Sequence, residues 1–120
     1  MADSPTTRSL KALRAQGYEA EVVERYNSFT QRRHDLFGII DILAIKGKET
    51  LAVQTTSGSN IQARATKILA AAITERLLAA GWEIQVHGWR RLKVKRGGKA
   101  FRWRCAVLNI RELALGGSVQ

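Results

Sequence analysis

The sequence predicts one α/β domain in which helices flank a mixed central β-sheet. Patterns typical of helices and strands alternate along the chain in the order helix, strand, hairpin, helix, strand. The 120 residues can bury one core but not a second sizeable one. A content of 45% hydrophobic and 25% charged residues, with one proline, is typical of globular proteins rather than disordered or fibrous ones. We therefore expect a single domain over residues 1–120.

The first elements of the expected fold are a helix and a strand. Leucine and alanine alternate with basic residues from Thr7 to Gln16, which predicts a helix that Gly17 ends. Residues 1–7 before it are expected to form a flexible arm. Weak alternation from Tyr18 to Tyr26 predicts a strand, which leads into a polar loop over residues 27–34.

A β-hairpin is expected next, from two strands that a short turn connects. Its strands are Leu36–Ile45 and Glu49–Thr56, and Gly47-Lys48 between them is typical of a type II′ turn. In that register the partners of each pair have residue numbers that sum to 95. Asp41 would lie directly opposite Gln54, and Ile39 opposite Thr56.

A long helix and a further strand follow this hairpin. Ser59 and Gln62 fit a capping box, so the helix should begin near Asn60; its apolar pattern continues to about Ala80, and Gly81 would end it. The strand is expected over Glu83–Gly88. These elements, from residue 7 to residue 88, would form the core of the domain.

A basic hairpin is predicted over residues 89–110, before a tail over residues 111–120. With Gly97-Gly98 as a two-residue turn, the residue numbers of each pair sum to 195. One face would then be mostly apolar, and the other would hold like charges opposite one another. The apolar pairs are Val94–Phe101, Leu92–Trp103 and Arg90–Cys105; the charged pairs are Lys93–Arg102 and Arg91–Arg104, with Lys95 beside Ala100.

The charge of the chain is the first indication of function. The formal net charge is +10, and residues 61–120 hold twelve basic but only three acidic side chains. This asymmetry predicts a surface that binds a polyanion, nucleic acid being the usual case and an anionic membrane or an acidic protein the alternatives. A solvated edge hairpin protected from aggregation is the structural alternative. That alternative needs only one or two charges, whereas eight basic residues lie between Arg90 and Arg104.

Other features favour a reducing compartment. Cys105 is the single cysteine, so no internal disulfide forms and no thiolate cluster can hold zinc. Neither long apolar stretch reaches the roughly 20 residues of a spanning helix, and the polar N-terminus is unlike a secretory signal. We expect a cytoplasmic protein that does not associate with membranes.

Two segments of the first hairpin carry a resemblance to a known family. Asp41-Ile42-Leu43-Ala44 and Leu51–Thr56 resemble the metal-binding aspartate and the glutamate-x-lysine strand of the PD-(D/E)xK nuclease superfamily, in particular Holliday-junction-resolvase-like and VRR-NUC-like members. The resemblance covers residues 7–86. It implies a restriction-endonuclease-like fold, Mg²⁺ or Mn²⁺ as cofactor, structured or branched DNA as substrate, and a homodimer.

The motif departs from the family pattern at three positions. Ile40 stands where proline is usual, Gln54 replaces the acidic residue and Thr56 replaces the lysine. An amide oxygen can still bind a hard cation but brings no negative charge. The missing acid could come from Asp35, Glu21 or Glu24. The missing amine could come from Lys67 or, as a weaker candidate, from Lys46 or Lys48.

These residues lead to a candidate site and three functional hypotheses. The catalytic candidates are Asp41, Gln54, Thr56 and Lys67, and the metal candidates are Asp41, Gln54 and Asp35. A desolvated carboxylate at Asp41 inside an apolar strand points to a functional role, whereas Gln54 could merely hydrogen-bond it. The hypotheses are a metal-dependent endonuclease, a degenerate nuclease fold kept for binding, and a basic protein- or RNA-binding module without phosphodiester chemistry.

A further set of residues is expected to contact nucleic acid. The loop before the long helix offers an anion-binding N-terminus, which would place a phosphate beside Asp41 and Gln54. Trp89 is the tryptophan that the predicted pairing puts on the basic face, where it could stack on a base. The full set is Ser57, Ser59, Asn60, Arg64, Trp89, Arg91, Lys93, Lys95, Arg102 and Arg104.

Overall fold

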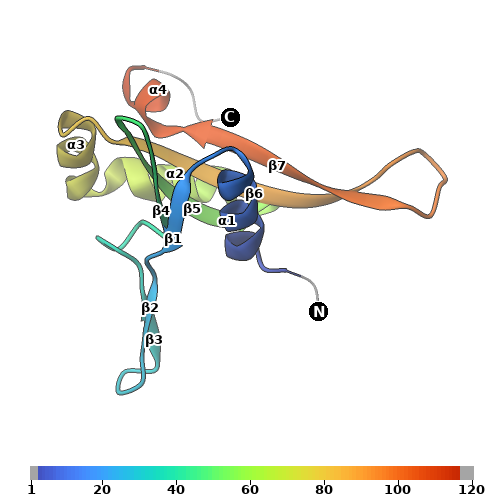
Figure 1. Cartoon of the computed structure of the whole chain (residues 1–120), viewed down its shortest axis with the longest axis horizontal. Helices are drawn as coiled ribbons and strands as arrows, with labels where there is room; N and C mark the ends of the chain where they lie inside the picture. Colours follow the sequence, from blue (N-terminus) through green and yellow to red (C-terminus); the bar gives the residue numbers. More distant parts are fainter. Residues whose placement is uncertain (1–2, 117–120) are drawn as a thin grey trace.

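A five-stranded mixed sheet forms the centre of the molecule in the computed structural model, which describes residues 3–116 (Figure 1). The strand order is β1-β4-β5-β6-β7; β5 and β6 are parallel and the other neighbours antiparallel. The predicted class, an α/β fold with a mixed sheet flanked by helices, is confirmed. The strands are β1 (Glu19–Val22), β4 (Ile42–Lys46), β5 (Glu49–Ser57), β6 (Glu83–Lys93) and β7 (Phe101–Asn109).

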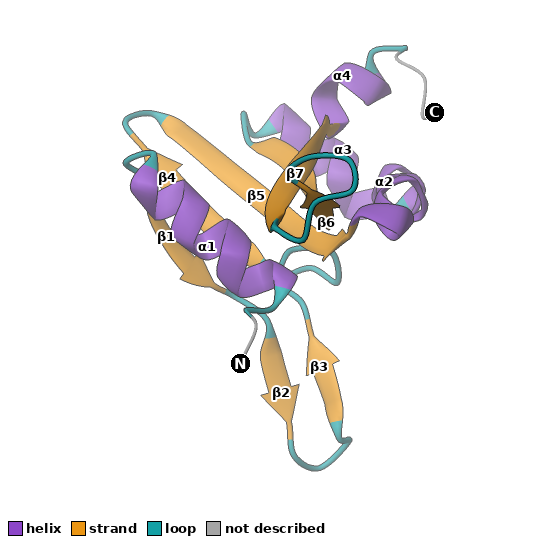
Figure 2. Cartoon of the chain, turned by 90° about the vertical axis from the view of Figure 1, so that its right-hand side faces the viewer, coloured by secondary structure: helices purple, strands orange, loops and turns teal. Residues whose placement is uncertain are grey.

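Helices cover both faces of this sheet. Helix α1 (Pro5–Ala15) packs on one face against β1, β4, β5 and β6. Helices α2 (Ile61–Ala70), α3 (Ala72–Ala79) and α4 (Ile110–Ala114) pack on the other face (Figure 2). Within the described residues, no helix is both long and apolar enough to cross a membrane.

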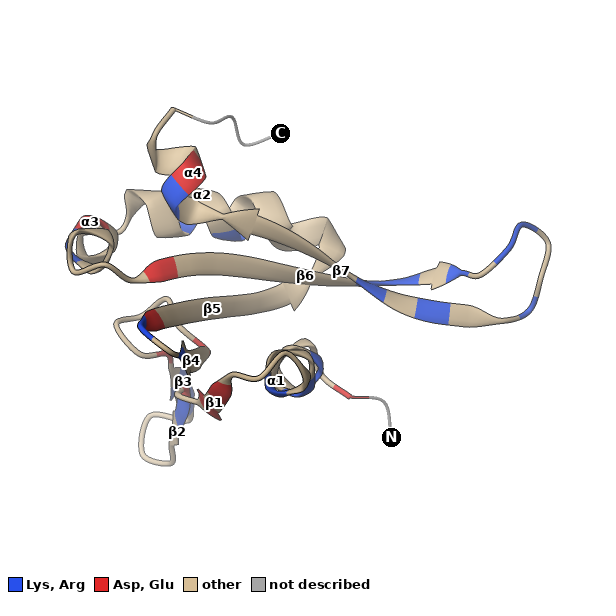
Figure 3. Ribbon diagram, turned by 45° about the horizontal axis from the view of Figure 1, so that its top comes forward, with Lys and Arg blue, Asp and Glu red and all other residues tan. Residues whose placement is uncertain are grey.

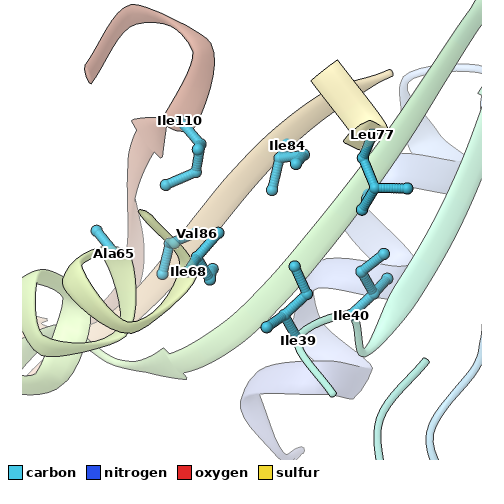
Figure 4. Close-up of a cluster of buried hydrophobic side chains, with 9 residues drawn as sticks. Ile39, Ile40, Ala65, Ile68, Leu77, Ile84, Val86 and Ile110 are labelled. Carbon is cyan, nitrogen blue, oxygen red and sulfur yellow. The ribbon is translucent and has the colours of Figure 1, made fainter. Parts of the chain in front are cut away.

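Two buried clusters correspond to the two faces of the sheet, because successive residues of a strand point to opposite sides. On the α1 side, Leu13 packs against Leu51 and Val53 of β5. On the other side, the core includes Ile68 of α2 and Ile84 of β6 (Figure 4).

The N-terminal helix starts earlier than its sequence pattern indicates. Ser4 caps it by accepting a hydrogen bond from the Thr7 backbone N–H at 3.1 Å, and Pro5 occupies the first turn. Residues 5–7 therefore belong to a helix and not to the expected flexible arm. Residues 1–2 of that arm and residues 117–120 of the expected tail lie outside the described residues.

The first predicted hairpin is confirmed in register but shorter than expected. β4 pairs with β5 from Ile42–Val53 to Lys46–Glu49, and Gly47 has a φ of +59°, as a type II′ turn requires. The ladder ends before the expected pair Asp41–Gln54, and the Asp41 backbone N–H donates to the Val53 carbonyl at 2.9 Å. The predicted strand from Leu36 is wrong. Residues 36–40 form a turn in which Phe37 and Gly38 both have positive φ, so Ile39 does not face Thr56.

A separate small hairpin replaces the second half of the predicted strand Tyr18–Tyr26. β2 (Arg25–Asn27) pairs with β3 (Arg32–His34), and the two strands leave the body of the molecule together (Figures 1 and 2). The polar segment expected to be a loop over residues 27–34 therefore contains a strand and a tight connection.

The predicted long helix is broken into two. Ala71 has a ψ of 130°, outside the helical range, and separates α2 from α3. The predicted capping box is also wrong: the 3₁₀ turn Gly58–Asn60 precedes α2, and no side chain of the described residues caps the N-terminus of α2. The start near Asn60 is confirmed, and so is the end before Gly81.

The pairing of β6 with β7 differs from the prediction by one residue. β6 continues past Gly88 to Lys93, and partners sum to 194, with Val94 and Ala100 bonded beyond the strands. A β-turn with Gly97 as its third residue, at φ +77°, closes the connection. The observed pairs are Trp89–Cys105, Arg90–Arg104, Arg91–Trp103, Leu92–Arg102 and Lys93–Phe101.

This one-residue difference exchanges the faces of one strand relative to the other. The predicted charged pairs Lys93–Arg102 and Arg91–Arg104 are therefore wrong, as are the apolar pairs of the other face. Each face of the β6–β7 pair carries both basic and apolar side chains.

Candidate metal centre and basic surfaces

A hollow of about 640 Å³ opens where β4 begins, between the N-terminus of α1 and the start of α2. Asp41, Gln54 and Thr55 line it from the sheet, and Glu24 and Asp35 line it from either side of the β2–β3 hairpin. The structure therefore brings the predicted Asp41, Gln54 and Asp35 together in one cavity.

Three carboxylates meet in this cavity. One oxygen atom from each of Glu24, Asp35 and Asp41 lies within 4.8 Å of the other two. Asp41 holds its place because its Oδ2 accepts hydrogen bonds from the Thr55 backbone N–H at 2.8 Å and from the Thr55 hydroxyl at 3.2 Å. Among residues 3–116, no lysine or arginine forms a salt bridge with Asp35 or Asp41.

This crowding changes the acidity of Asp41. Burial raises its pKa from the ordinary 3.8 to about 7, and the negative charges of Asp35 and Glu24 act in the same direction, while the Thr55 backbone N–H opposes them. At neutral pH the group is poised between its acid and its anion. A cation would stabilise the anion and displace the proton.

Gln54 provides an independent sign that this cavity takes a ligand. The residue is 1% exposed, and its Nε2 lies 3.5 Å from Asp35 Oδ2. Its Oε1 is buried and has no hydrogen-bond partner among residues 3–116, an arrangement that costs free energy unless something else binds the oxygen. An amide oxygen and nearby carboxylates are the hard ligands that Mg²⁺ and Mn²⁺ prefer, so the residues present fit such an ion.

The lysine candidates do not reach the cavity. Lys67 is exposed on α2 and is not among the residues that line the hollow. Lys46 lies at the opposite end of β4, where its Nζ donates to the Gln16 carbonyl, and Lys48 is in the adjoining turn. Thr56 is buried, 6% exposed, and does not line the hollow either.

Two arginines line the cavity instead. Arg64 of α2 was expected among the nucleic-acid contacts, whereas Arg33 of β3 was not singled out. Arg33 Nη1 lies 3.6 Å from Glu24 Oε1. Its position depends on the β2–β3 pairing, which the short segments Arg25–Asn27 and Arg32–His34 signal only weakly.

The loop before α2 lies elsewhere than predicted. Ser57 and Ser59 line a hollow with Arg8, Trp103 and Arg90, apart from the cavity of Asp41 and Gln54. Asn60 Nδ2 donates to Ser57 Oγ at 3.1 Å. An anion at this loop would consequently meet the β6–β7 pair rather than the carboxylates.

Trp89 lines the hollow that Ser57 and Ser59 share with Arg90, and its role in base stacking stays a prediction. It is half-buried, and its Nε1 donates to Ser9 Oγ at 2.8 Å. Because Gln85 Oε1 can only accept, His87 Nε2 donates to it at 2.9 Å. Burial lowers the pKa of His87 to about 4, so the ring is neutral and its Nδ1 accepts from the Ser9 hydroxyl at 2.9 Å. The chain of hydrogen bonds attaches α1 to β6.

More exposed aromatic rings lie on β7. Trp103 is 42% exposed, with the Arg8 guanidinium 3.7 Å from its ring centre, and Arg91 lies 3.9 Å over the ring of Phe101. Basic residues continue along the outer part of the β6–β7 pair and its connection (Figure 3). The predicted contact residues Arg91, Lys93, Lys95, Arg102 and Arg104 are all on this exposed part.

Comparisons with known protein families, with curated proteins and with solved structures find no match for this chain.

Proposed function

We propose that the protein is a Mg²⁺- or Mn²⁺-dependent endonuclease of PD-(D/E)xK-like fold that acts on structured or branched DNA. The observation that carries this proposal is that Gln54, whose buried Oε1 has no hydrogen-bond partner among the described residues, lines the cavity in which three carboxylates cluster. The motif resemblance at Asp41 and the basic β6–β7 surface support it independently. A homodimer, which the family resemblance implies, and a cytoplasmic location, which the sequence suggests, belong to the same proposal.

The residues of the cavity would have different roles. Asp41, Asp35 and the Gln54 amide oxygen would hold the cation, which supplies positive charge that acidifies water and polarises a phosphodiester. Asp41 would hold the ion as a carboxylate, without its proton. Arg64 at the rim can neutralise a phosphate oxygen in place of the absent lysine, because a guanidinium binds phosphate well.

The β6–β7 surface would hold the DNA. The sequence from Arg90 to Arg104 has eight basic residues and no acidic one, and Arg90 lies directly opposite Arg104. Like charges opposite one another in a ladder are destabilising by themselves. A phosphate backbone relieves this repulsion and releases counterions, so binding is expected to weaken steeply with salt.

Cleavage assays test the nuclease activity. A four-way junction and a linear duplex of matched length are incubated with the protein in Mg²⁺, Mn²⁺ or chelator. We expect ion-dependent cleavage of the junction that Asp41→Asn reduces by at least about 100-fold, as expected on losing an electrostatic contribution of several kcal/mol. Glu112→Gln, which removes an exposed acid of α4, should cleave like the wild type. Cleavage that persists in chelator or in Asp41→Asn contradicts the proposal.

A catalytically degenerate DNA-binding protein is the second candidate. It is favoured by the missing acid and amine at Gln54 and Thr56, and by the absence of a lysine among the described residues that line the cavity. It predicts salt-dependent DNA binding with no cleavage by the wild type in either metal. Preference for RNA or for an acidic protein over DNA would instead support a general basic binding module.

A further inference from the structure

We infer that the β2–β3 hairpin, residues 24–35, is a finger that inserts Phe29 against an unstacked base of the DNA bound at the carboxylate cavity. This inference rests on the proposed function and adds to it a contact that recognises distorted DNA. The finger projects from the body of the molecule (Figures 1 and 2).

The base of the finger is the candidate metal centre itself. In the β2–β3 register the paired residues sum to 59, from Asn27–Arg32 to Arg25–His34. Glu24 and Asp35 are the next positions in that register, and both contribute to the carboxylate cluster. Nucleic acid held at the cavity must therefore pass beside the finger.

The tip of the finger presents an aromatic ring to solvent. Phe29 is 96% exposed, the highest value among the exposed large hydrophobic residues of the described chain. The Asn27 Oδ1 accepts hydrogen bonds from the backbone N–H groups of Phe29 and Thr30, at 2.9 and 3.3 Å. This Asx-type turn fixes the backbone that carries the ring. The core gains nothing from Phe29, since it buries almost no surface there.

The flank of the finger is basic. Arg25 and His34 are opposite each other, and Arg32 lies two residues from His34, so these three side chains share one face of the two-stranded ribbon. No acidic residue lies between Arg25 and His34. A cationic ribbon that ends in an exposed aromatic ring suits a phosphate backbone whose bases are accessible, because bases stack on such rings.

The length of the finger fixes where the contact should fall. Five residues separate Glu24 from Phe29, which spans at most about 16 Å at roughly 3.3 Å per residue. Successive phosphates on one strand advance about 3.4 Å along the helix axis. Phe29 should thus touch a base within about five nucleotides of the phosphate at the cavity.

Fluorescence measurements test the finger. Junctions and matched linear duplexes carrying 2-aminopurine within five nucleotides of the branch point are titrated with protein in chelator, where no metal-dependent cleavage can occur. We expect the wild type to increase the 2-aminopurine emission of the junction, which reports unstacking. Phe29→Ala should abolish the increase and weaken junction binding by about five- to 150-fold, the effect of one lost base stack, with duplex affinity unchanged.

Two further variants serve as controls. Phe29→Trp should restore the binding, and Leu115→Ala, which removes another exposed apolar side chain at 83% exposure, should leave it unchanged. Equal losses on junction and duplex, or no loss in Phe29→Ala, overturn the inference. If the wild type cleaves junctions and Phe29→Ala binds normally, the finger alone is refuted. If the wild type does not cleave but the Phe29 effect is present, the nuclease proposal alone fails.

Discussion

Replacing Asp41 by asparagine should stabilise the protein at alkaline pH when no divalent cation is present. Folding raises the pKa of Asp41 from 3.8 to about 7, so the folded state keeps a proton that the unfolded state has lost. The stability that this carboxyl contributes is complete below pH 3.8 and is lost as the pH rises to about 7. Asparagine does not titrate, and its side-chain oxygen can still accept from the Thr55 N–H.

The expected magnitude follows from the two pKa values. Their difference corresponds to about 4 kcal/mol, and solvent screening in the open cavity lowers the expectation to about 2–4 kcal/mol. Wild type and Asp41→Asn should accordingly differ little near pH 4 and increasingly toward pH 8. At pH 8, a divalent cation at ten times its Kd should then raise the free energy of unfolding of the wild type by about 1.4 kcal/mol.

Urea unfolding at pH 4.5, 6 and 8, with chelator or with Mg²⁺, measures this difference directly. Subtracting the Asp41→Asn free energy of unfolding from that of the wild type removes the titration of the other carboxylates. The Glu112→Gln variant provides the matched control for loss of one negative charge. A pH-independent difference, or equal stabilisation of both proteins by the cation, would refute the electrostatic reasoning.

Three other features of the structure give testable expectations. Burial lowers the pKa of His87 from 6.5 to about 4, so the contribution of this side chain to the free energy of unfolding is complete above pH 6.5. About 3 kcal/mol of that contribution is lost as the pH falls to 4, and urea unfolding of the wild type and of His87→Gln should show the difference. In Gly88→Ala the new Cβ would lie 3.2 Å from the Gly58 Cα, and we expect a loss of about 1–3 kcal/mol by the same assay, a wild-type value being the contrary result. Arg90→Ala and Arg104→Ala should each reduce, by about 1, the slope of log K for DNA binding against the logarithm of the salt concentration. An unchanged slope would show that these arginines do not contact the DNA.

Short-range signals predicted the fold best. The type II′ turn at Gly47-Lys48 is defined by two adjacent residues, so it fixed the β4–β5 register correctly. The pair Gly97-Gly98 predicted the wrong register, because adjacent glycines fit more than one type of turn and more than one position in it. Gly97 takes the third position of a longer connection, and every later pair moves by one residue.

The candidate site was only partly predictable. Asp41 and Gln54 could be placed together from one local register, and both line the cavity. Glu24, by contrast, was only one of several possible acids. Glu24 lies close to Asp35 because two three-residue strands pair. The sequence pattern of such short strands cannot be distinguished from that of a polar loop. Lys67 was inferred from helical spacing alone, which does not indicate which face of α2 meets the cavity.

The position of a bound cation tests the central interpretation most directly. Crystals of the protein soaked in Mn²⁺ can be examined by anomalous scattering at the manganese absorption edge. We predict a peak between Asp35, Asp41 and the Gln54 amide oxygen, and no such peak in crystals of Asp41→Asn. Ordered carboxylates and a Gln54 amide with no anomalous peak between them, or a peak that persists in the variant, would contradict the assignment of a metal centre.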